Sequence, residues 1–353
     1  MTKFSSRLRT YFYKSRQGFL WVQKEIYDFW HQNSGDWSWA DEKPRPIAAV
    51  NRSLWKSSVP SLSFYAMLGL SSIISTLGLL ASSAAVIIGA MIIAPLMGSI
   101  LGIGYAIVVG NRRLLKRSAL TTFKGILLAI LAPMLITLLF GLTNSNPEIA
   151  ARIKPTLIDL GVALAAGAAG AFATSRRQVE SALSGVAISV ALVPPLSVIG
   201  IGIAWWDPNV TLGASVLFAT NLTGIIFSGA LVFLWQRYGS IERAKKGLLA
   251  GLLMLFLLGL PLGWSLRNIL VEERVQRQVD VLLRRQTVTF ADTEIRSIDV
   301  QPTLQGLYVE LEVEAKANSI SRQQIKLVKA FLRKQLKQPI QLKVRVVPTE
   351  IFE

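Results

Sequence analysis

A long apolar stretch that is almost free of acidic side chains constrains this chain more than any other feature. Only five of the 21 acidic residues fall between Leu62 and Arg267, and all the others lie in the two ends of the chain. A transmembrane helix needs about 20 consecutive, mostly apolar residues, and this stretch has room for several. The sequence therefore predicts a helical membrane domain with a charged, water-compatible segment on each side.

Seven segments of the stretch have the length and composition of transmembrane helices. Together they predict an all-α polytopic membrane domain over residues 61–266. Residues 1–60 are rich in aromatic and basic side chains, and they form a predicted amphipathic and interfacial N-terminal segment. The predicted helices are 62–81, 84–109, 118–141, 156–173, 183–205, 212–234 and 247–266.

The positive charges of the loops predict the orientation, because Lys and Arg collect in cytoplasmic loops. Ten cations fall in three alternate loops, whereas the opposite loops hold only Arg152 and Lys154. We therefore expect a cytoplasmic N-terminus, and seven crossings then place the C-terminal segment outside the cytoplasm. The ten cations lie within Arg112–Arg117, Arg176–Arg177 and Arg237–Lys246.

Residues 267–353 have the pattern of a small soluble α+β domain. Apolar side chains alternate along Leu307–Val313 and again along Ile340–Val346, as in strands with one buried face. Between these strands, Ser321 and Gln324 form a capping box at the start of a predicted helix. No group of acids, bases or metal ligands gathers in this segment, so we expect a separate extracytoplasmic domain without a catalytic centre.

The membrane domain contains an internal repeat, with units at about 62–141 and 156–234. Gly89 of the first unit corresponds to Gly185 of the second, and further matches follow in the same order through three helices. A unit of three helices makes the next unit enter the membrane from the opposite side. The sequence therefore predicts a 3+3 inverted repeat, a plan found in many secondary transporters. The extra helix, 247–266, would carry the C-terminal domain.

Prolines at matching depth in the two units are the main candidates for a functional site. Pro95 and the pair Pro194–Pro195 lie near the predicted middle of the bilayer. Proline lacks the amide donor, so a carbonyl one turn earlier loses its helical partner. Two interpretations stay open: an unwound substrate site between the repeats, and a pair of ordinary proline kinks. Nearby glycines with a predicted hinge or packing role are Gly89, Gly98 and Gly185.

Three polar side chains complete the predicted substrate-binding set. Thr220 and Asn221 lie near the middle of the sixth predicted helix, where they contact either a solute or a neighbouring helix. Asp159 is the acidic residue nearest to the interior of a predicted span. It either stabilises the first turn of the fourth helix or binds a cation or proton during transport.

Composition excludes several kinds of function. The chain has no cysteine and a single histidine, His31, so a metal site built from several Cys or His ligands is excluded. A phosphate-binding loop and a membrane Ser–His or diaspartyl pair are also absent from the sequence. We therefore expect a protein that is not an enzyme and has no cofactor. The net charge of +17 is spread along the chain, so we expect no nucleic-acid partner.

Four stretches of the membrane domain carry a resemblance to a known family. They resemble the prokaryotic hydrophobic membrane family called domain of unknown function 389, over about residues 60–240. The resemblance implies a prokaryotic inner-membrane protein, and it implies no substrate. The stretches are Val86–Gly98, Ala165–Gly170, Gly185–Pro195 and Thr220–Leu222.

The leading functional hypothesis is a transporter or channel for an unidentified small solute or ion, with its site near the bilayer middle between the repeats. The alternative is a non-transporting sensor or scaffold that acts through the extracytoplasmic domain. Expected partners are the lipid bilayer, the solute or ion and, as an option, further copies of the chain. The two hypotheses differ in whether the purified protein moves a solute across a liposome membrane.

Overall fold

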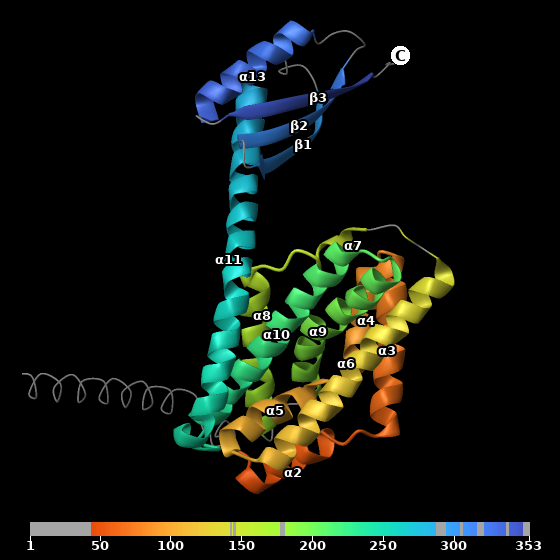
Figure 1. Ribbon diagram of the computed structural model, residues 1–353, viewed down its shortest axis with the longest axis vertical. Helices are drawn as coiled ribbons and strands as arrows, with labels where there is room; N and C mark the ends of the chain where they lie inside the picture. The colour runs from red at the N-terminus through yellow and green to blue at the C-terminus, as the bar shows by residue number, and fades with distance from the viewer. Residues whose placement is uncertain are drawn as a thin grey trace, which may run out of the picture.

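The computed structural model describes residues 44–141, 143, 146–176, 181–286, 294–303, 306–315, 321–336 and 339–348. It is mostly helical, with a bundle from which one long helix extends to a small sheet domain (Figure 1). Of the predicted N-terminal amphipathic and interfacial segment, 1–60, residues 1–43 lie outside the described residues. The bundle helices are α2 (Ile47–Ser57), α3 (Leu62–Leu80), α4 (Ala84–Ile93), α5 (Met97–Val109), α6 (Arg112–Phe140), α7 (Pro147–Ala150), α8 (Leu157–Ser175), α9 (Ser181–Ala204), α10 (Pro208–Trp235) and α11 (Ile241–Gln286).

Within the described residues, five helices are long and apolar enough to cross a membrane. They are α3, α6, α8, α10 and the Ile241–Gly263 part of α11. The pair α4 and α5 makes a sixth if it is counted as one span bent by 57°. Helix α9 adds a shorter apolar segment, Ala191–Ala204. The described structure thus gives five or six such helices where the sequence predicted seven.

Two of these helices begin earlier than the sequence predicted, because polar loop residues cap them. The Asn111 side chain accepts a hydrogen bond from the Leu114 amide at 3.1 Å, so α6 already begins at Arg112. The Asp207 carboxylate accepts one from the Asn209 amide at 2.9 Å and stands before a proline at the first position of α10. Side-chain acceptors and a first-turn proline are both favoured at helix starts.

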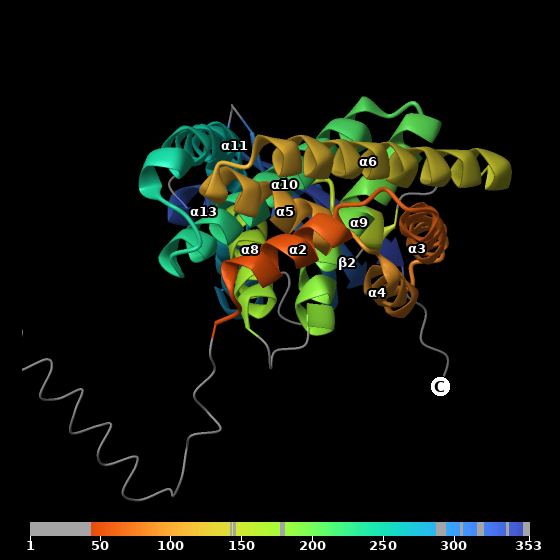
Figure 2. The same ribbon diagram turned by 90° about the horizontal axis from the view of Figure 1, so that it is seen from below.

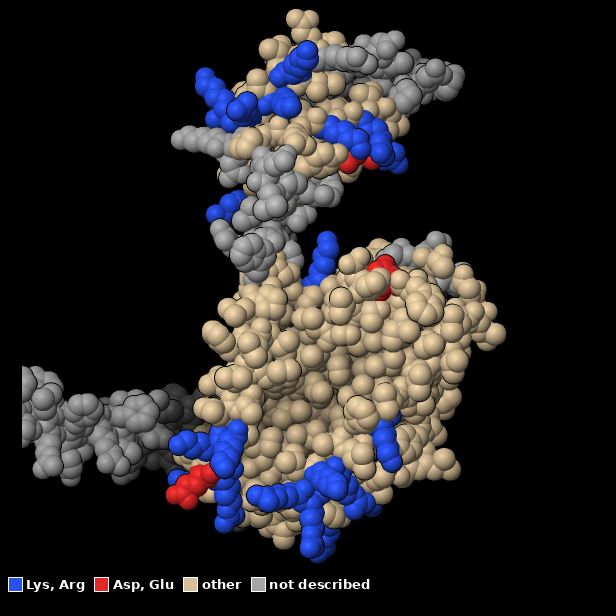
Figure 3. All heavy atoms as spheres, viewed as in Figure 1, with Lys and Arg blue, Asp and Glu red and all other residues tan. Residues whose placement is uncertain are grey.

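The outer surface of the bundle is strongly apolar, as a lipid-facing surface must be. Leu139 is 79% exposed and Phe256 is 66% exposed. Lys and Arg side chains gather at the lower end of the bundle, below a largely uncharged surface (Figure 3). At the same end α2 lies across the bundle beside α5 (Figure 2). Arg117 of α6 stacks on the Trp55 ring of α2 with its guanidinium carbon 5.0 Å from the ring centroid, so α2 belongs to the cation-rich end.

The C-terminal residues form the predicted α+β arrangement. A three-stranded sheet in the order β1 (Glu294–Thr303), β2 (Gly306–Ala315) and β3 (Ile340–Pro348) pairs β1 with β2 antiparallel and β2 with β3 parallel. Helix α13 (Arg322–Leu336) is the crossover between β2 and β3. One apolar cluster joins the strands to α13 and to Val279 of α11. On the exposed face, a 2.8 Å hydrogen bond from Lys343 lowers the pKa of Glu310.

Candidate functional site

The helix that contains Pro95 is broken, as the sequence predicted. Helix α4 ends at Ile93 and α5 begins at Met97, with a bend of 57° between them. Ala94 has φ −69° and ψ 121°, an extended conformation that the residue before a proline favours. Helix α4 has ten residues, which at about 1.5 Å per residue span about 15 Å. That is half of the ~30 Å hydrocarbon core of a typical bilayer.

Hydroxyl groups from two other helices donate hydrogen bonds to backbone carbonyls at this break. Ser189 of α9 donates from Oγ to the Ala94 carbonyl at 3.1 Å. Ser71 of α3 donates from Oγ to the Ala90 carbonyl at 2.6 Å. In hydrocarbon, backbone groups without such partners cost several kcal/mol, so these contacts make the break tolerable. Pro95 was a predicted site residue and Ser189 was not, because the partner of Ser189 lies 95 residues away in the chain.

The predicted break at the second proline site is wrong. Helix α9 runs through Pro194 and Pro195 without interruption. Pro195 has no amide to offer the Ala191 carbonyl, and Asn221 of α10 donates to that carbonyl from Nδ2 at 2.8 Å instead. A side chain from another helix therefore replaces the missing backbone donor, and α9 keeps its helical path.

Asn221 and Thr220 play different roles although they are neighbours. Asn221 is 4% exposed, and its Oδ1 atom has no hydrogen-bond partner among the described residues. Thr220 is fully buried and donates to the Val216 carbonyl of its own helix at 2.7 Å. The structure therefore brings Asn221 to the second proline site and leaves Thr220 with a local bond. A buried acceptor without a partner costs about 1–3 kcal/mol, so Asn221 is the stronger candidate for contact with a solute.

Buried polar side chains near the two proline sites form four separate hydrogen bonds, which we group as one row. Ser197 of α9 donates to the Ser75 hydroxyl of α3 at 3.1 Å, and both side chains are fully buried. We call this row the polar seam. It lies between α3, α9 and α10 in the apolar bundle. Its members are Ser71, Ser75, Ser189, Ser197 and Asn221.

A cavity of about 790 Å³ reaches the break from the cation-rich end of the bundle. Its walls come from α2, the start of α3, the end of α4 and the start of α5, and they include both Ala94 and Pro95. Its charged lining residues are Arg45 and Lys56. Ligand cavities in proteins are commonly about 300–1,000 Å³, so this space is large enough for a small solute.

The backbone at Arg45 is held firmly beside this cavity. The Arg45 amide donates to the Ser175 carbonyl at 2.8 Å, and the Tyr238 hydroxyl donates to the Arg45 carbonyl at 2.8 Å. Burial raises the pKa of Tyr238, while Arg176 and Arg45 oppose that shift. The phenol therefore stays protonated and remains a donor at neutral pH. These contacts fix the segment before α2 against the end of α8.

The predicted hinge or packing glycines lie in different surroundings. A Cβ at Gly98 would stand 2.3 Å from the Ser57 Cβ, so α5 and α2 approach closely there and the packing role is supported. A Cβ at Gly89 would meet nothing within 4 Å, so close packing does not explain that glycine. Gly185 lies in the first part of α9, where side-chain surroundings are outside the described part of the chain.

Asp159 caps the start of α8. Its carboxylate accepts hydrogen bonds from the Thr156 amide at 2.8 Å and from the Thr156 hydroxyl at 2.9 Å. Thr156 in turn accepts from the Ile158 amide at 3.2 Å, which completes a capping box. The structure thus gives Asp159 the helix-start role, and a coupling role in transport stays a prediction.

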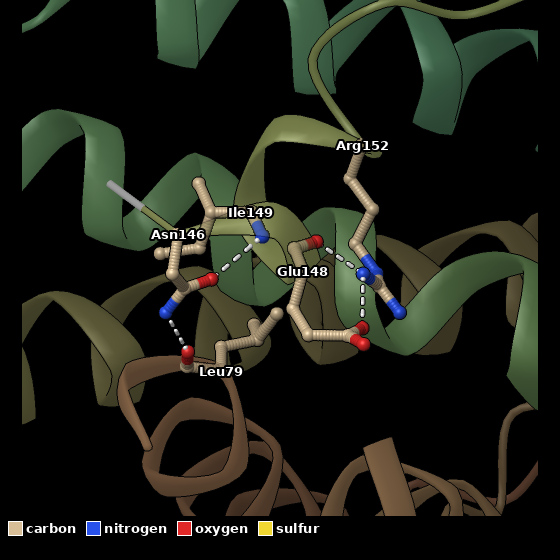
Figure 4. A network of polar contacts seen from close by, with 5 residues as sticks. All are labelled: Leu79, Asn146, Glu148, Ile149 and Arg152. Atoms are coloured by element: carbon tan, nitrogen blue, oxygen red, sulfur yellow. Dashed lines mark hydrogen bonds and ion pairs between the residues drawn. The ribbon is translucent and has the colours of Figure 1, made fainter. Parts of the chain in front are cut away.

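The short helix α7 is tied to the other end of the bundle. Asn146 donates from Nδ2 to the Leu79 carbonyl at 2.5 Å and accepts from the Ile149 amide at 3.1 Å (Figure 4). Arg152 forms an ion pair with Glu148 at 2.9 Å within the same turn. This network fastens the connection between α6 and α8 to the end of α3.

Together these features define a class: a polytopic α-helical membrane protein with a broken central helix, a buried polar seam and a cavity at its cation-rich end. Comparison with known proteins gives the family. Residues 91–227 match the family described as "Domain of unknown function (DUF389)". The uncharacterized protein MJ0678 of Methanocaldococcus jannaschii is 30% identical over 223 residues, which cover 61% of this chain and 69% of that protein. The chain belongs to the DUF389 family.

Proposed function

We propose that this protein is a transporter or channel for a small solute or ion and performs no chemical conversion. One observation carries the proposal: a cavity of about 790 Å³ ends at Ala94 and Pro95, where α4 and α5 are broken. Broken helices near the bilayer middle are tolerated where they line a cavity, and transporters place substrate sites there. Asn221 does not line this cavity, and we assign its Oδ1, which has no partner among the described residues, to a solute that moves deeper into the bundle.

Helix lengths support the inverted repeat that this proposal requires. Helices α3 and α8 each have 19 residues, and α6 and α10 have 29 and 28. The central elements differ, because α4–α5 is broken whereas α9 is continuous. Two inverted units in unlike conformations give the two membrane sides unlike access to the site, as expected of a transporter in one of its alternating states. The cavity opens at the cation-rich end, so this state would be open to the cytoplasm.

We count α9 as a seventh crossing, which would put the C-terminal domain outside the cytoplasm of a prokaryotic plasma membrane. The cation-rich end of the bundle supports this orientation. We expect alkaline phosphatase fused after Glu353 to be active, because this reporter folds only outside the cytoplasm. A fusion at Arg113, at the cation-rich start of α6, should be inactive. An inactive C-terminal fusion together with an active cytoplasmic reporter at the same point would remove the seven-crossing topology.

Solute movement is tested with purified protein in liposomes. Gradients of potassium chloride, sodium chloride and potassium phosphate serve as probes for current, and glycerol entry is followed by light scattering. We expect a flux above that of empty liposomes for at least one probe. Pro95→Ala restores an amide donor to α4–α5, and we expect it to reduce that flux by about tenfold, equivalent to about 1.4 kcal/mol in the barrier.

The matched control is Pro261→Ala, which removes an exposed proline from α11 away from the cavity. This variant should keep the flux of the unmodified protein. If liposomes with and without protein behave alike toward all four probes, the transport proposal fails. If P95A and P261A reduce flux equally, the break at Pro95 is not part of the pathway.

A sensor or scaffold is the second candidate, and one observation favours it. Helix α11 continues for 46 residues from the bundle to the sheet domain, and its Val279 packs in the core of that domain. An uninterrupted helix can pass a displacement from one domain to the other. Absence of flux combined with a partner that binds the C-terminal domain would favour this alternative.

A further inference from the structure

The described part of the chain begins beside the cavity at the cation-rich end. Arg45 lines the cavity and directly follows the first described residue, Pro44. The Arg45 amide donates to the Ser175 carbonyl and the Arg45 carbonyl accepts from the Tyr238 hydroxyl, both at 2.8 Å. The residues before Pro44 are therefore tethered at the cavity, and a short tether gives a segment an effective concentration on the order of 1 mM at its binding site.

The stretch just before this anchor differs in composition from the rest of the N-terminal segment. Residues 36–42 contain three acidic residues and two tryptophans, and they contain no Lys or Arg. The cations that precede this stretch end at Lys24. The acidic and aromatic residues of the stretch are Asp36, Trp37, Trp39, Asp41 and Glu42.

The wall of the cavity offers three kinds of contact. Two cations, Arg45 and Lys56, line it, and its described lining includes no Asp or Glu. An apolar flank is formed by Met67, which is 43% exposed, and Ile92, which is 62% exposed. Ile92 and Ile93 also belong to the last turn of α4, and the last carbonyls of a helix have no amide partner within that helix. The cavity therefore suits carboxylates, apolar rings and N–H donors at different parts of its wall.

Residues 36–42 carry these three kinds of group on one segment. The carboxylates suit the two cations. Tryptophan has a large apolar ring and an indole N–H group that only donates, so Trp37 and Trp39 suit the apolar flank and the carbonyl end of α4. A small anion would be repelled by these carbonyls, and a small cation would be repelled by Arg45 and Lys56. A chain segment with separate acidic and aromatic side chains fits the whole wall better than either ion.

The distance between the two cations also favours a segment. They stand at opposite ends of α2, which has 11 residues and is therefore about 16 Å long. The chain from Asp36 to Pro44 reaches at most about 26 Å when it is fully extended. Asp36 can therefore reach Lys56 while Asp41 stays near Arg45, whereas one small ion cannot contact both cations.

We propose that residues 36–42 dock in this cavity and cover its opening, with Asp36 beside Lys56 and the two tryptophan rings on the apolar flank. Exposed ion pairs contribute little in water, so the buried rings supply most of the binding and the charges set the direction of the segment. The docking itself does not depend on transport. Its consequence rests on the proposed function, because a docked segment would keep a solute away from the break at Pro95.

The test uses the full-length protein, which has no cysteine, purified and depleted of lipid in a neutral detergent. S38C places one thiol in the segment, and S63C places a second thiol in the cavity lining. A short bis-maleimide joins two thiols that lie close together, and mass spectrometry of the cleaved protein measures the product. Mixing isotope-labelled with unlabelled protein separates links within one chain from links between two chains.

The matched control is the pair S38C/K116C. Lys116 is exposed at the same end of the bundle and is not among the described lining residues. Its neighbour Arg117 stacks on Trp55 of α2, so the control position also lies beside α2. We expect at least about fivefold more product within one chain from S38C/S63C than from the control, a ratio equivalent to a preference of about 1 kcal/mol.

Further substitutions in the S38C/S63C protein test the individual contacts. W37A/W39A should lower the yield to that of the control pair, because the rings supply most of the binding. K56E should lower the yield by about two- to fivefold, in line with the strength of an exposed ion pair. Lys56 is exposed, so this variant should fold. D36K combined with K56E restores a pair of opposite charges and should restore the yield.

The outcomes separate this inference from the proposed function. Equal yields from the two pairs, or a yield that W37A/W39A leaves unchanged, overturn the docking and leave the cavity to a solute or a lipid. Product found only between different chains also overturns it, because the occupant is then the segment of a second copy. Docking without any flux in liposomes leaves this inference standing and removes the transport proposal. Flux without preferential cross-linking in the cavity does the reverse.

Discussion

Gly167→Ala is expected to push α8 and α10 apart and to give the largest loss of stability among the variants proposed for this protein. A Cβ at Gly167 would lie 2.3 Å from the Ser228 hydroxyl oxygen, 2.4 Å from the Ile225 carbonyl oxygen and 2.6 Å from the Ile225 Cα. Two of these three atoms are backbone, so no rotation of a side chain relieves the contact. Overpacking of this kind costs about 1–3 kcal/mol, and close helix approach is the main source of cohesion between helices in lipid.

Gly161→Ala is the matched control on the same helix. A Cβ at Gly161 would meet nothing within 4 Å. Alanine is favoured over glycine in a helix by about 1 kcal/mol, so this variant should be neutral or slightly stabilising. The measurement is the unfolding midpoint of each purified variant in the same detergent, followed by size-exclusion chromatography after heating. Equal midpoints for the Gly167 and Gly161 variants would show that α8 and α10 do not pack as closely as described.

Asn221→Leu is expected to give the second largest loss of stability. The leucine keeps roughly the volume of the side chain but leaves the Ala191 carbonyl without the 2.8 Å donor from Nδ2. Hydrogen bonds between membrane helices contribute about 0.6 kcal/mol on average and up to about 1.7 kcal/mol. We place this bond at the upper end, at about 1–2 kcal/mol, because Pro195 offers that carbonyl no helical amide. The leucine also removes the buried, unpartnered Oδ1 atom, which offsets part of this loss.

Pro195→Ala gives this prediction an internal control. Alanine at position 195 restores an amide one turn after Ala191, so the carbonyl regains a helical donor. The loss caused by N221L should therefore be smaller in the P195A background than in the unmodified protein. A double-mutant cycle measured by thermal unfolding gives the coupling between the two positions. If the stability changes caused by N221L and P195A simply add in the double variant, Asn221 does not act through the carbonyl that Pro195 leaves without a helical donor.

The sequence alone determined the features that depend only on residues close to one another along the chain. The scarcity of charge between Leu62 and Arg267 indicated the membrane domain, and the missing amide of Pro95 indicated the break between α4 and α5. Four residues of local pattern were enough for the capping box of α13 at Ser321 and Gln324. Each of these signals is complete within a few turns of chain, so it can be read without knowing the fold.

The tertiary structure decided which partner each unsatisfied group finds. Pro95 and Pro195 remove the same kind of donor, yet only the first breaks its helix, because Asn221 reaches the Ala191 carbonyl from thirty residues away. The charged side chains that line the cavity beside the break are Arg45 and Lys56, which lie outside the repeat units and were not predicted as site residues. Sequence shows that a carbonyl has lost its amide, but only the packed helices bring a distant side chain within hydrogen-bond distance of it.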